Sequence, residues 1–252
     1  MAEYTLKKTV NWFLCRTPSF YRFLIRFLKL RDHREKLVYL AYVRKGDHVI
    51  DIGANYGVIS LLLSNITGAR GKVYSYEAVK PTFDILSANI FTYRFYDNLQ
   101  LYNYAVSDTR EPVTIIVPGN DYGQASMKIH ESGSWTENTA NTVYTCSCIK
   151  LDDHLAHFEK VDFIKLDIEG AELPALKGAA EVIKKFRPVL YVEVFKNWTK
   201  EFGYHPMDLY NFIKESGYRR FFIKTPDGIN ALADPAIQLN QDYSADLICL
   251  PE

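Results

Sequence analysis

Short apolar segments alternate with helix-like segments from about residue 45 onward, and this alternation restricts the fold more than any other feature. The first apolar run, at 48–53, leads into a predicted helix at 56–67. Further strands are expected at 72–77, 99–106, 161–170, 189–195, 218–224 and 245–250, with helices at 81–95, 172–185 and 205–216. Strands separated by helices form parallel sheets that are covered on both faces. The last two strands are close enough in sequence to pair antiparallel.

Residues 1–45 differ from the rest and are expected to form an N-terminal helical extension. Apolar residues recur there at three- and four-residue intervals among Lys and Arg, and Pro18 divides the run into two helices. One interpretation is a layer or lid packed on the core. The other is a basic amphipathic surface, within residues 1–30, that contacts a membrane or a lipid-linked substrate. The main domain is expected to cover 46–252.

An insertion near 107–150 interrupts the strand–helix rhythm of the main domain. Extra strands are expected at 111–118 and 141–149, and a polar segment rich in Gly and Ser separates them. Loops of this length are uncommon in compact domains and are often functional. The insertion is therefore expected to form part of a substrate wall or, alternatively, a mobile excursion on the surface.

Charge and composition exclude several classes of protein. The 252 residues carry 30 Lys+Arg and 30 Asp+Glu, and this zero balance argues against a nucleic-acid partner, which usually binds a basic excess. The N-terminus lacks a signal-peptide pattern and no apolar run has the length of a membrane span, so we expect a cytoplasmic protein. The cysteines form no C-x-x-C pair and are expected to be buried thiols: Cys15, Cys146, Cys148 and Cys249.

The strongest functional motif is the segment DIGANYG at 51–57, where a strand passes into a helix. Glycines there let a ligand approach the backbone, and ligands bind beyond the carboxyl ends of parallel strands. The dinucleotide fingerprint needs a second glycine where this chain has Asn55. Asp51 would also repel a phosphate. A cationic ligand without phosphate, S-adenosylmethionine, therefore fits better than a nicotinamide dinucleotide.

Two further positions predict contacts with a nucleoside. Glu77 ends the second strand, where a carboxylate can accept hydrogen bonds from both hydroxyls of a ribose. Ser107 and Asp108 follow the third strand, at a turn that lies beside the adenine in such folds. The alternative for Asp108 is a cap on that turn.

Ionisable residues follow the fourth strand, in the segment KLDIEG at 165–170. Lys165, Asp167 and Glu169 alternate, so they would share one side if the strand continued, and Glu193 on the next strand faces the same edge. Such a cluster could orient an acceptor hydroxyl or take its proton, or it could be a structural ion pair. Asp167 and Glu193 could together hold a divalent metal, but we expect none. His130, in the insertion, is a weaker candidate for the base.

Five motifs in order resemble the FkbM family of S-adenosylmethionine-dependent methyltransferases. They are DIGANYG, YSYEAVKPTFDILSANI, YAVSD, VDFIKLDIEGAELPALKGA and RPVLYVEV, within residues 46–196. The resemblance implies the class I methyltransferase fold, a Rossmann-like seven-stranded sheet of order 3-2-1-4-5-7-6 with strand seven antiparallel. It also implies O-methylation of a hydroxyl on a sugar, glycolipid or related natural product.

The resemblance also implies roles for single residues. Asp51, Gly53, Asn55 and Gly57 would line the methionine end, Glu77 the ribose and Asp108 the adenine, while Lys165, Asp167 and Glu169 would lie near the reacting atoms. Ala78 and Val79 depart from the Pro and polar residue that are common after Glu77. The expected partner is a small-molecule or glycan acceptor, free or lipid-linked. The alternatives are a non-catalytic cofactor-binding module and a nicotinamide-dependent reductase.

Overall fold

The structure is a computed structural model, and the part of the chain that it describes comprises Pro18 and residues 36–119, 121–136, 140–225, 228–242 and 244–251. Apart from Pro18, the possible membrane contact predicted for residues 1–30 lies outside the described residues. Of the predicted extension, the structure describes mainly its last part, which forms α3 (Lys36–Tyr42).

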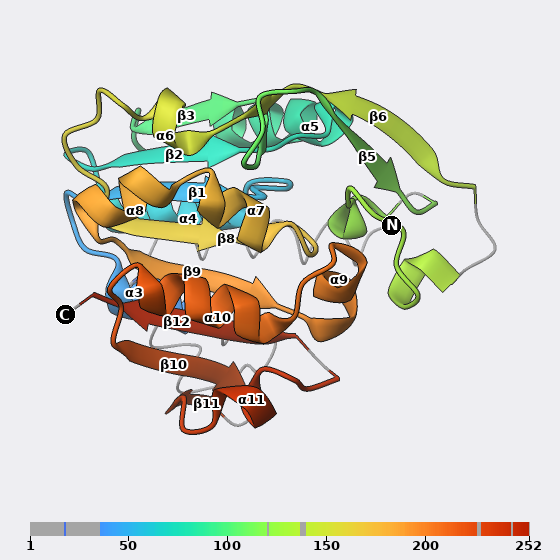
Figure 1. Ribbon diagram of the computed structural model, residues 1–252. Helices are drawn as coiled ribbons and strands as arrows, with labels where there is room; N and C mark the ends of the chain where they lie inside the picture. Colours follow the sequence, from blue (N-terminus) through green and yellow to red (C-terminus); the bar gives the residue numbers. More distant parts are fainter. Residues whose placement is uncertain are drawn as a thin grey trace.

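Eight strands form the central sheet, in the order β11-β10-β12-β9-β8-β1-β2-β3. They are β1 (His48–Ile52), β2 (Lys72–Tyr76), β3 (Leu99–Tyr102), β8 (Phe163–Leu166), β9 (Val189–Val194), β10 (Arg220–Thr225), β11 (Gly228–Ala231) and β12 (Ala245–Leu250). The strands from β9 to β3 pair in parallel, whereas β12 is antiparallel to both β9 and β10 (Figure 1). Without β11, this is the predicted order 3-2-1-4-5-7-6, and the fold prediction is confirmed.

The sheet departs from the prediction in two of its strands. The eighth strand, β11, was not expected; it pairs antiparallel with β10 at the edge. The third predicted strand, 99–106, is two strands, because the chain leaves the sheet after Tyr102. The side-chain amide of Asn103 donates to the carbonyls of Glu77 and Ala78, at 2.8 and 2.9 Å. The next residues, β4 (Ala105–Val106), pair instead with β7 (Cys148–Ile149).

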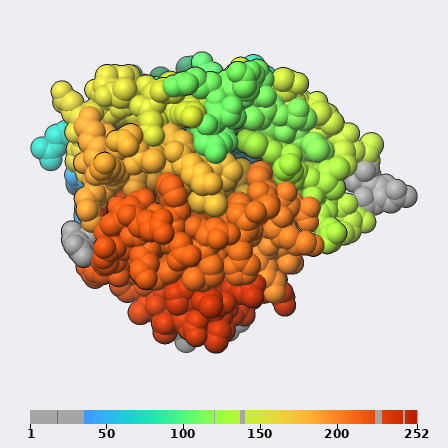
Figure 2. All heavy atoms as spheres, viewed as in Figure 1, coloured from blue at the N-terminus to red at the C-terminus, as the bar shows by residue number. Residues whose placement is uncertain are grey.

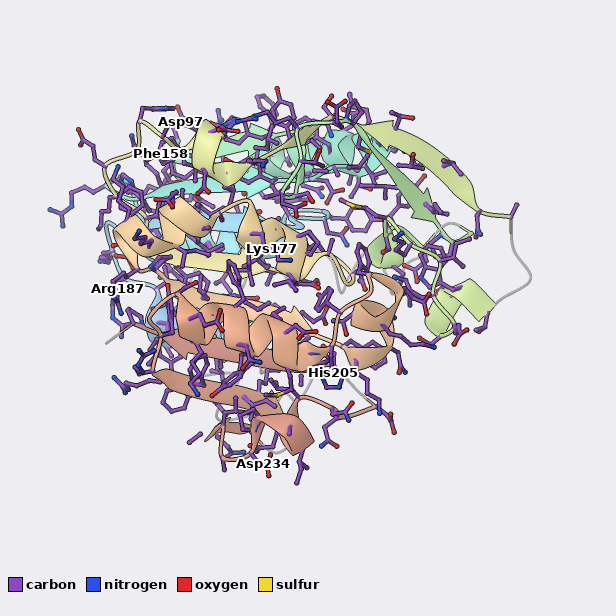
Figure 3. The ribbon with its side chains drawn as sticks, in the orientation of Figure 1. Asp97, Phe158, Lys177, Arg187, His205 and Asp234 are labelled. Atoms are coloured by element: carbon purple, nitrogen blue, oxygen red, sulfur yellow. The ribbon has the colours of Figure 1, made fainter. Side chains whose placement is uncertain are left out.

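Helices cover both faces of the sheet (Figure 1). One layer contains α3, α4 (Val58–Thr67) and α5 (Lys80–Tyr93), and the other contains α6 (Leu151–His154), α7 (Glu172–Lys177), α8 (Ala180–Phe186) and α10 (Pro206–Glu215). In Figure 3, Arg187 after α8 and His205 before α10 mark opposite ends of the second layer. Each layer buries its own apolar cluster against the sheet. None of the helices within the described ranges could span a membrane.

The predicted helix at 172–185 is two helices that meet at Gly178. A Cβ atom at Gly178 would lie 2.0 Å from the carbonyl oxygen of Ser107, so only glycine permits this approach. The segment after β4 therefore packs directly on the junction between α7 and α8. The apolar periodicity of residues 172–185 could not predict this contact, because Ser107 and Gly178 are about 70 residues apart in the chain.

The two strands predicted in the insertion are present as β5 (Val113–Val117) and β6 (Thr142–Cys146), which pair antiparallel, although the second predicted segment, 141–149, also contains the separate strand β7. Between these strands lie two short 3-10 helices, η2 (Tyr122–Gln124) and η3 (Gly133–Thr136). Figure 1 shows the hairpin at the side of the carboxyl ends of the parallel strands, with the segment between its strands near α9 (Lys196–Glu201). A third apolar cluster lies beneath it and includes Cys146 and Cys148, which are buried free thiols as expected. The remaining helix, α11 (Pro235–Gln238), follows β11.

Candidate active site

A cavity of about 240 Å3 lies at the carboxyl edge of the sheet. Its walls come from the segments after β1, β2, β8 and β9 and from the insertion. Figure 2 shows the surface hollowed between green and gold atoms, the colours of residues near 105 and 170. This is the position in which parallel α/β sheets bind ligands.

The loop after β1 is held tightly against the neighbouring strand ends. The amides of Gly53 and Ala54 both donate to the carbonyl of Tyr76, at 3.0 Å each. Gly53 has φ +77°, and a Cβ atom there would lie 1.9 Å from the carbonyl oxygen of Asp167. Gly53 and Asn55 line the cavity. Gly57 instead caps α4, with φ +88°, and is not among the lining residues.

Asp51 lies behind the cavity wall and is completely buried. Its carboxylate lies 3.3 Å from the Lys165 ammonium and accepts a hydrogen bond of 2.6 Å from the Ser60 hydroxyl. Lys165 also donates to the carbonyl of Gly53, at 3.1 Å. Burial disfavours the charge on Lys165, but Asp167 and Asp51 outweigh this effect and raise its pKa. The cation that Asp51 accommodates is therefore a lysine of this chain, and Asp51 does not reach the cavity itself.

Glu77 follows β2 and turns its carboxylate into the cavity wall. One oxygen accepts from the amide of Asn55 and the other from the amide of Val79, both at 3.0 Å. Burial raises the pKa of this carboxyl group to about 7, although the two amides lower it. Each carboxylate oxygen has a further lone pair, so Glu77 can still accept from two hydroxyls of a ligand.

We expect the affinity for S-adenosylhomocysteine to rise about tenfold between pH 6 and pH 8. Below a pKa of about 7 the Glu77 carboxyl is protonated and loses one acceptor; above that pKa both oxygens can accept from hydroxyls of a ligand. Titration calorimetry across this range measures the effect. The variant Glu77→Gln should bind more weakly and show little dependence on pH. An equal pH dependence in the variant would contradict the assignment.

The far end of the cavity is apolar and suits a flat base. Val79, Val106 and Ile115 line it, together with Tyr104 and Ala105. Small apolar walls of this kind are typical of nucleoside sites. The sequence predicts that Ser107 and Asp108 lie at this end. They come directly after Val106 in the chain, but neither lines the cavity. Ser107 is buried, and its hydroxyl lies 3.3 Å from the carboxylate of the exposed Asp108.

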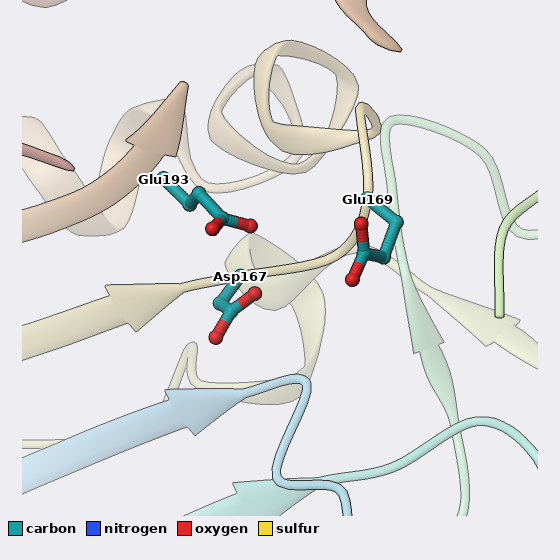
Figure 4. A group of neighbouring side chains, drawn as sticks. All are labelled: Asp167, Glu169 and Glu193. Atoms are coloured by element: carbon teal, nitrogen blue, oxygen red, sulfur yellow. The ribbon is translucent and has the colours of Figure 1, made fainter. Parts of the chain in front are cut away.

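Three carboxyl groups meet at the other end of the cavity: Asp167, Glu169 and Glu193 (Figure 4). Their nearest oxygen atoms all lie within 4.8 Å of one another. Lys165 contacts Asp167 at 3.2 Å, and the Ser244 hydroxyl donates to Glu193 at 2.7 Å. The sequence had assigned these four residues, Lys165 included, to one polar cluster, and the structure brings all of them together.

The protonation of these carboxyl groups follows from their surroundings. The enclosed position of Asp167 opposes its ionisation, but the ammonium of Lys165 outweighs this and lowers its pKa. Burial and the neighbouring carboxylates raise the pKa of Glu169 to about 11, and enclosure with Asp167 nearby raises that of Glu193. Asp167 is therefore the ionised member of the group.

Glu169 reaches the cluster through a turn, which differs from the predicted alternation along a strand. The strand β8 ends at Leu166, and Glu169 adopts a left-handed conformation with φ +57°. Glu172 accepts from the amides of Ile168 and Gly170, at 3.0 and 3.3 Å, and holds this turn. Ser126 of the insertion donates to the carbonyl of Glu169 at 2.8 Å. The insertion therefore helps to fix the position of Glu169.

His130 lies behind this turn rather than in the cavity. It is 3% exposed, and its Nε2 atom lies 2.9 Å from the hydroxyl of Ser126. Burial lowers its pKa to about 4, so the ring is neutral. His130 is not among the lining residues, and it supports Ser126 instead.

Residues of the insertion line the cavity, and its role as a substrate wall stays a prediction. Tyr122, Ser126 and Met127 face the space between Glu77 and Glu169. The sequence predicts a functional insertion here, but it singles out none of these three residues. Their spacing follows no catalytic motif, and only the antiparallel pairing of β5 with β6 brings them over the edge of the sheet.

Comparison with known proteins identifies the family. The model of the methyltransferase FkbM domain matches residues 51–220, more than half of the chain. No curated protein is similar enough in sequence to match.

Several solved structures are similar to the chain, all at low sequence identity. A methyltransferase FkbM from Methylobacillus flagellatus KT is 20% identical over 81% of this chain and 43% of its own, with a TM-score of 0.49. Fibrillarin from Aeropyrum pernix, solved with bound S-adenosylmethionine, is 11% identical over 83% and 68%, with a TM-score of 0.46. A methyltransferase from Aquifex aeolicus is 13% identical over 86% and 89%, with a TM-score of 0.45.

The chain thus spans less than half the length of the FkbM structure that it resembles. The family match itself extends from Asp51, in β1, to Arg220, in β10, and so includes both the Glu77 and the Asp167 ends of the cavity. The chain belongs to the FkbM family of S-adenosylmethionine-dependent methyltransferases.

Proposed function

We propose that the protein transfers a methyl group from S-adenosylmethionine to a hydroxyl of a sugar, glycolipid or related natural product. The observation that carries this proposal is the division of one cavity into two ends. One end presents Glu77 and an apolar wall, and the other presents an ionised Asp167 between two protonated carboxyl groups. The first end suits a nucleoside, and the second suits a hydroxyl that must lose its proton.

The residues of the cavity fit S-adenosylmethionine. Glu77 can accept from a ribose diol, and Val79, Val106 and Ile115 can cover an adenine. The close approach of Gly53 to Asp167 leaves the cavity without side-chain bulk at the position where the two strand ends meet. The ionised Asp167 at that end favours a positively charged ligand. When bound, the cofactor would supply an electrophilic methyl group attached to a sulfonium. The sulfur would leave as a neutral thioether.

Asp167 is the residue that we assign to the acceptor hydroxyl. Its side chain is 40% exposed, whereas that of Lys165 is 3% exposed. Lys165 holds Asp167 ionised, and the Asp167 carboxylate, which also accepts a hydrogen bond from Glu193, can accept the hydroxyl hydrogen and orient the oxygen lone pair. As the new bond forms, the proton passes to the Asp167–Glu193 pair, which then carries one more proton and one less negative charge. A positioned base of this kind contributes about 10²–10⁴-fold.

Alignment of the two substrates is the larger contribution. Holding reacting groups in position can supply about 7–11 kcal/mol at best. The rigid parts are the Gly53 loop and the Glu169 turn, each fixed by several backbone hydrogen bonds.

Calorimetry with S-adenosylmethionine, S-adenosylhomocysteine and NADH tests the cofactor half of the proposal. We expect the two adenosyl ligands to bind, NADH not to bind, and Glu77→Gln to weaken adenosyl binding. Binding of NADH in their place would favour the reductase. Tight adenosyl binding with no methyl transfer to any of a panel of glycosides, glycolipids and polyketides would favour a non-catalytic cofactor-binding module.

We further propose that the protein acts in the cytoplasm on a small-molecule or glycan acceptor, free or lipid-linked, and not on nucleic acid. A zero net charge supports the last point. Residues 1–30 are proposed to contact a membrane peripherally. Co-sedimentation of the full chain with anionic vesicles tests this contact, and failure to co-sediment at low salt would exclude it.

A further inference from the structure

A second cavity, of about 440 Å3, lies at the same edge of the sheet, next to β9, β10 and β12. It shares four residues with the first cavity: Gly53, Asn55, Asp167 and Glu193. We infer that this second cavity binds the methyl acceptor through a neutral, polyhydroxylated group, and that Lys224, Ser244 and Asp246 determine which acceptor fits. The inference rests on the proposed function.

The shared wall is the first argument. A methyl group passes directly from one substrate to the other, so the two must occupy adjoining spaces with nothing fixed between them. Asp167 and Glu193 line both cavities, and Asp167 is the carboxylate that we assign to the acceptor hydroxyl. An acceptor in the second cavity would therefore reach Asp167 without displacing a ligand that contacts Glu77.

The chemistry of the lining is the second argument. Lys224 and Asp246 form an ion pair across β10 and β12, and Tyr191 donates a hydrogen bond to Asp246. Ser244 donates to Glu193 at 2.7 Å. These groups place donors and acceptors side by side in fixed positions. Hydroxyl groups can donate and accept at once, so a polyhydroxylated ligand satisfies such a wall better than an apolar one.

The charges of the lining favour a neutral ligand. Lys165 lies against Asp51 and Asp167, and Lys224 lies against Asp246. Each lysine among the described lining residues thus has a carboxylate partner already. An anionic group would compete with these carboxylates for the ammonium groups and would lie beside like charges.

The extent of the family match is the third argument. The shared residues Gly53, Asn55, Asp167 and Glu193 lie inside the matched range 51–220. Lys224, Ser244 and Asp246 lie beyond it. The family model therefore includes the wall that the two cavities share but not these three residues of the second cavity.

Saturation-transfer NMR on the protein loaded with S-adenosylhomocysteine tests the inference. The probes are the methyl glycosides of glucose, galactose, mannose, fucose, rhamnose and N-acetylglucosamine, at millimolar concentration. We expect at least one glycoside to bind saturably. Ser244→Ala and Lys224→Met should each weaken that binding at least about fivefold, the loss of one hydrogen bond, with the affinity for S-adenosylhomocysteine unchanged.

Ser244 is exposed, so Ser244→Ala keeps the test valid if Lys224→Met destabilises the buried Asp246. Lys214→Met on α10 is the matched control and should change neither affinity. The inference is overturned if no glycoside binds the loaded protein. It is also overturned if the variants weaken the binding of S-adenosylhomocysteine instead, because the cofactor would then lie in this cavity. If the wild-type protein does not bind S-adenosylhomocysteine at all, the proposed function fails together with the inference.

Discussion

Replacing Asp167 with asparagine is expected to lower methyl transfer by about 10²–10⁴-fold. Asparagine keeps the size of the side chain but cannot hold the acceptor proton, and it removes the charge that Lys165 stabilises at 3.2 Å. The affinity for S-adenosylhomocysteine should change less than about tenfold, because the residues that we propose for the ribose and the adenine are others: Glu77, Val79, Val106 and Ile115. Single-turnover kinetics on saturated enzyme measure the loss.

The matched control is Asp97→Asn. Asp97 is exposed and precedes β3 at the opposite edge of the sheet, where Figure 3 shows it far from the carboxyl ends. This variant should transfer methyl groups at the wild-type rate. Wild-type turnover by Asp167→Asn would refute the role of Asp167, and an equal loss in both variants would point to a general effect on the fold.

Replacing Lys165 with methionine is expected to destabilise the protein by about 3–5 kcal/mol. The ammonium is 3% exposed and contacts Asp51, Asp167 and the carbonyl of Gly53. Methionine fills similar space but leaves Asp51, which is 0% exposed, as a buried charge with only a hydroxyl partner. Urea unfolding followed by circular dichroism measures the change in the free energy of unfolding.

Lys160→Met provides the comparison for Lys165. Lys160 also contacts two carboxylates, those of Asp162 at 3.0 Å and Asp47 at 3.8 Å, but its side chain is 45% exposed. Water screens such a pair, so its loss should cost about 0–1 kcal/mol. Similar losses in the two variants would show that the buried position of Lys165 has no special effect on stability.

Much of the cofactor site could be predicted from the sequence because its residues follow strand ends. Glu77 and Asp167 directly follow a strand, Asp51 and Glu193 are each the last residue but one of a strand, and parallel pairing brings such ends to one edge. The sequence could not show which of these side chains faces a ligand. Asp51 and Asp167 occupy similar positions at strand ends. Asp51, however, is completely buried against Lys165, whereas Asp167 lines both cavities.

Residues that reach the site from elsewhere were not predictable. The hydroxyl of Ser126 donates a hydrogen bond to the carbonyl of Glu169, which is 43 residues away in the sequence. That of Ser244 donates to Glu193, which is 51 residues away. Neither serine belongs to a motif, and each is placed only by the pairing of strands that are distant in sequence. Gly178 was not predictable either, because only the nearby carbonyl of Ser107 leaves no room there for a Cβ atom.

The amino-acid sequence by itself determined the order of strands and helices, the parallel sheet and the family, because apolar periodicity and short motifs are local properties. The tertiary structure decided the turn that carries Glu169, the burial of Asp51 and the second cavity beside Lys224 and Asp246. These features depend on contacts between strands that are far apart in the chain. Burial and charge pairing exist only after those strands have come together, so no local pattern records them.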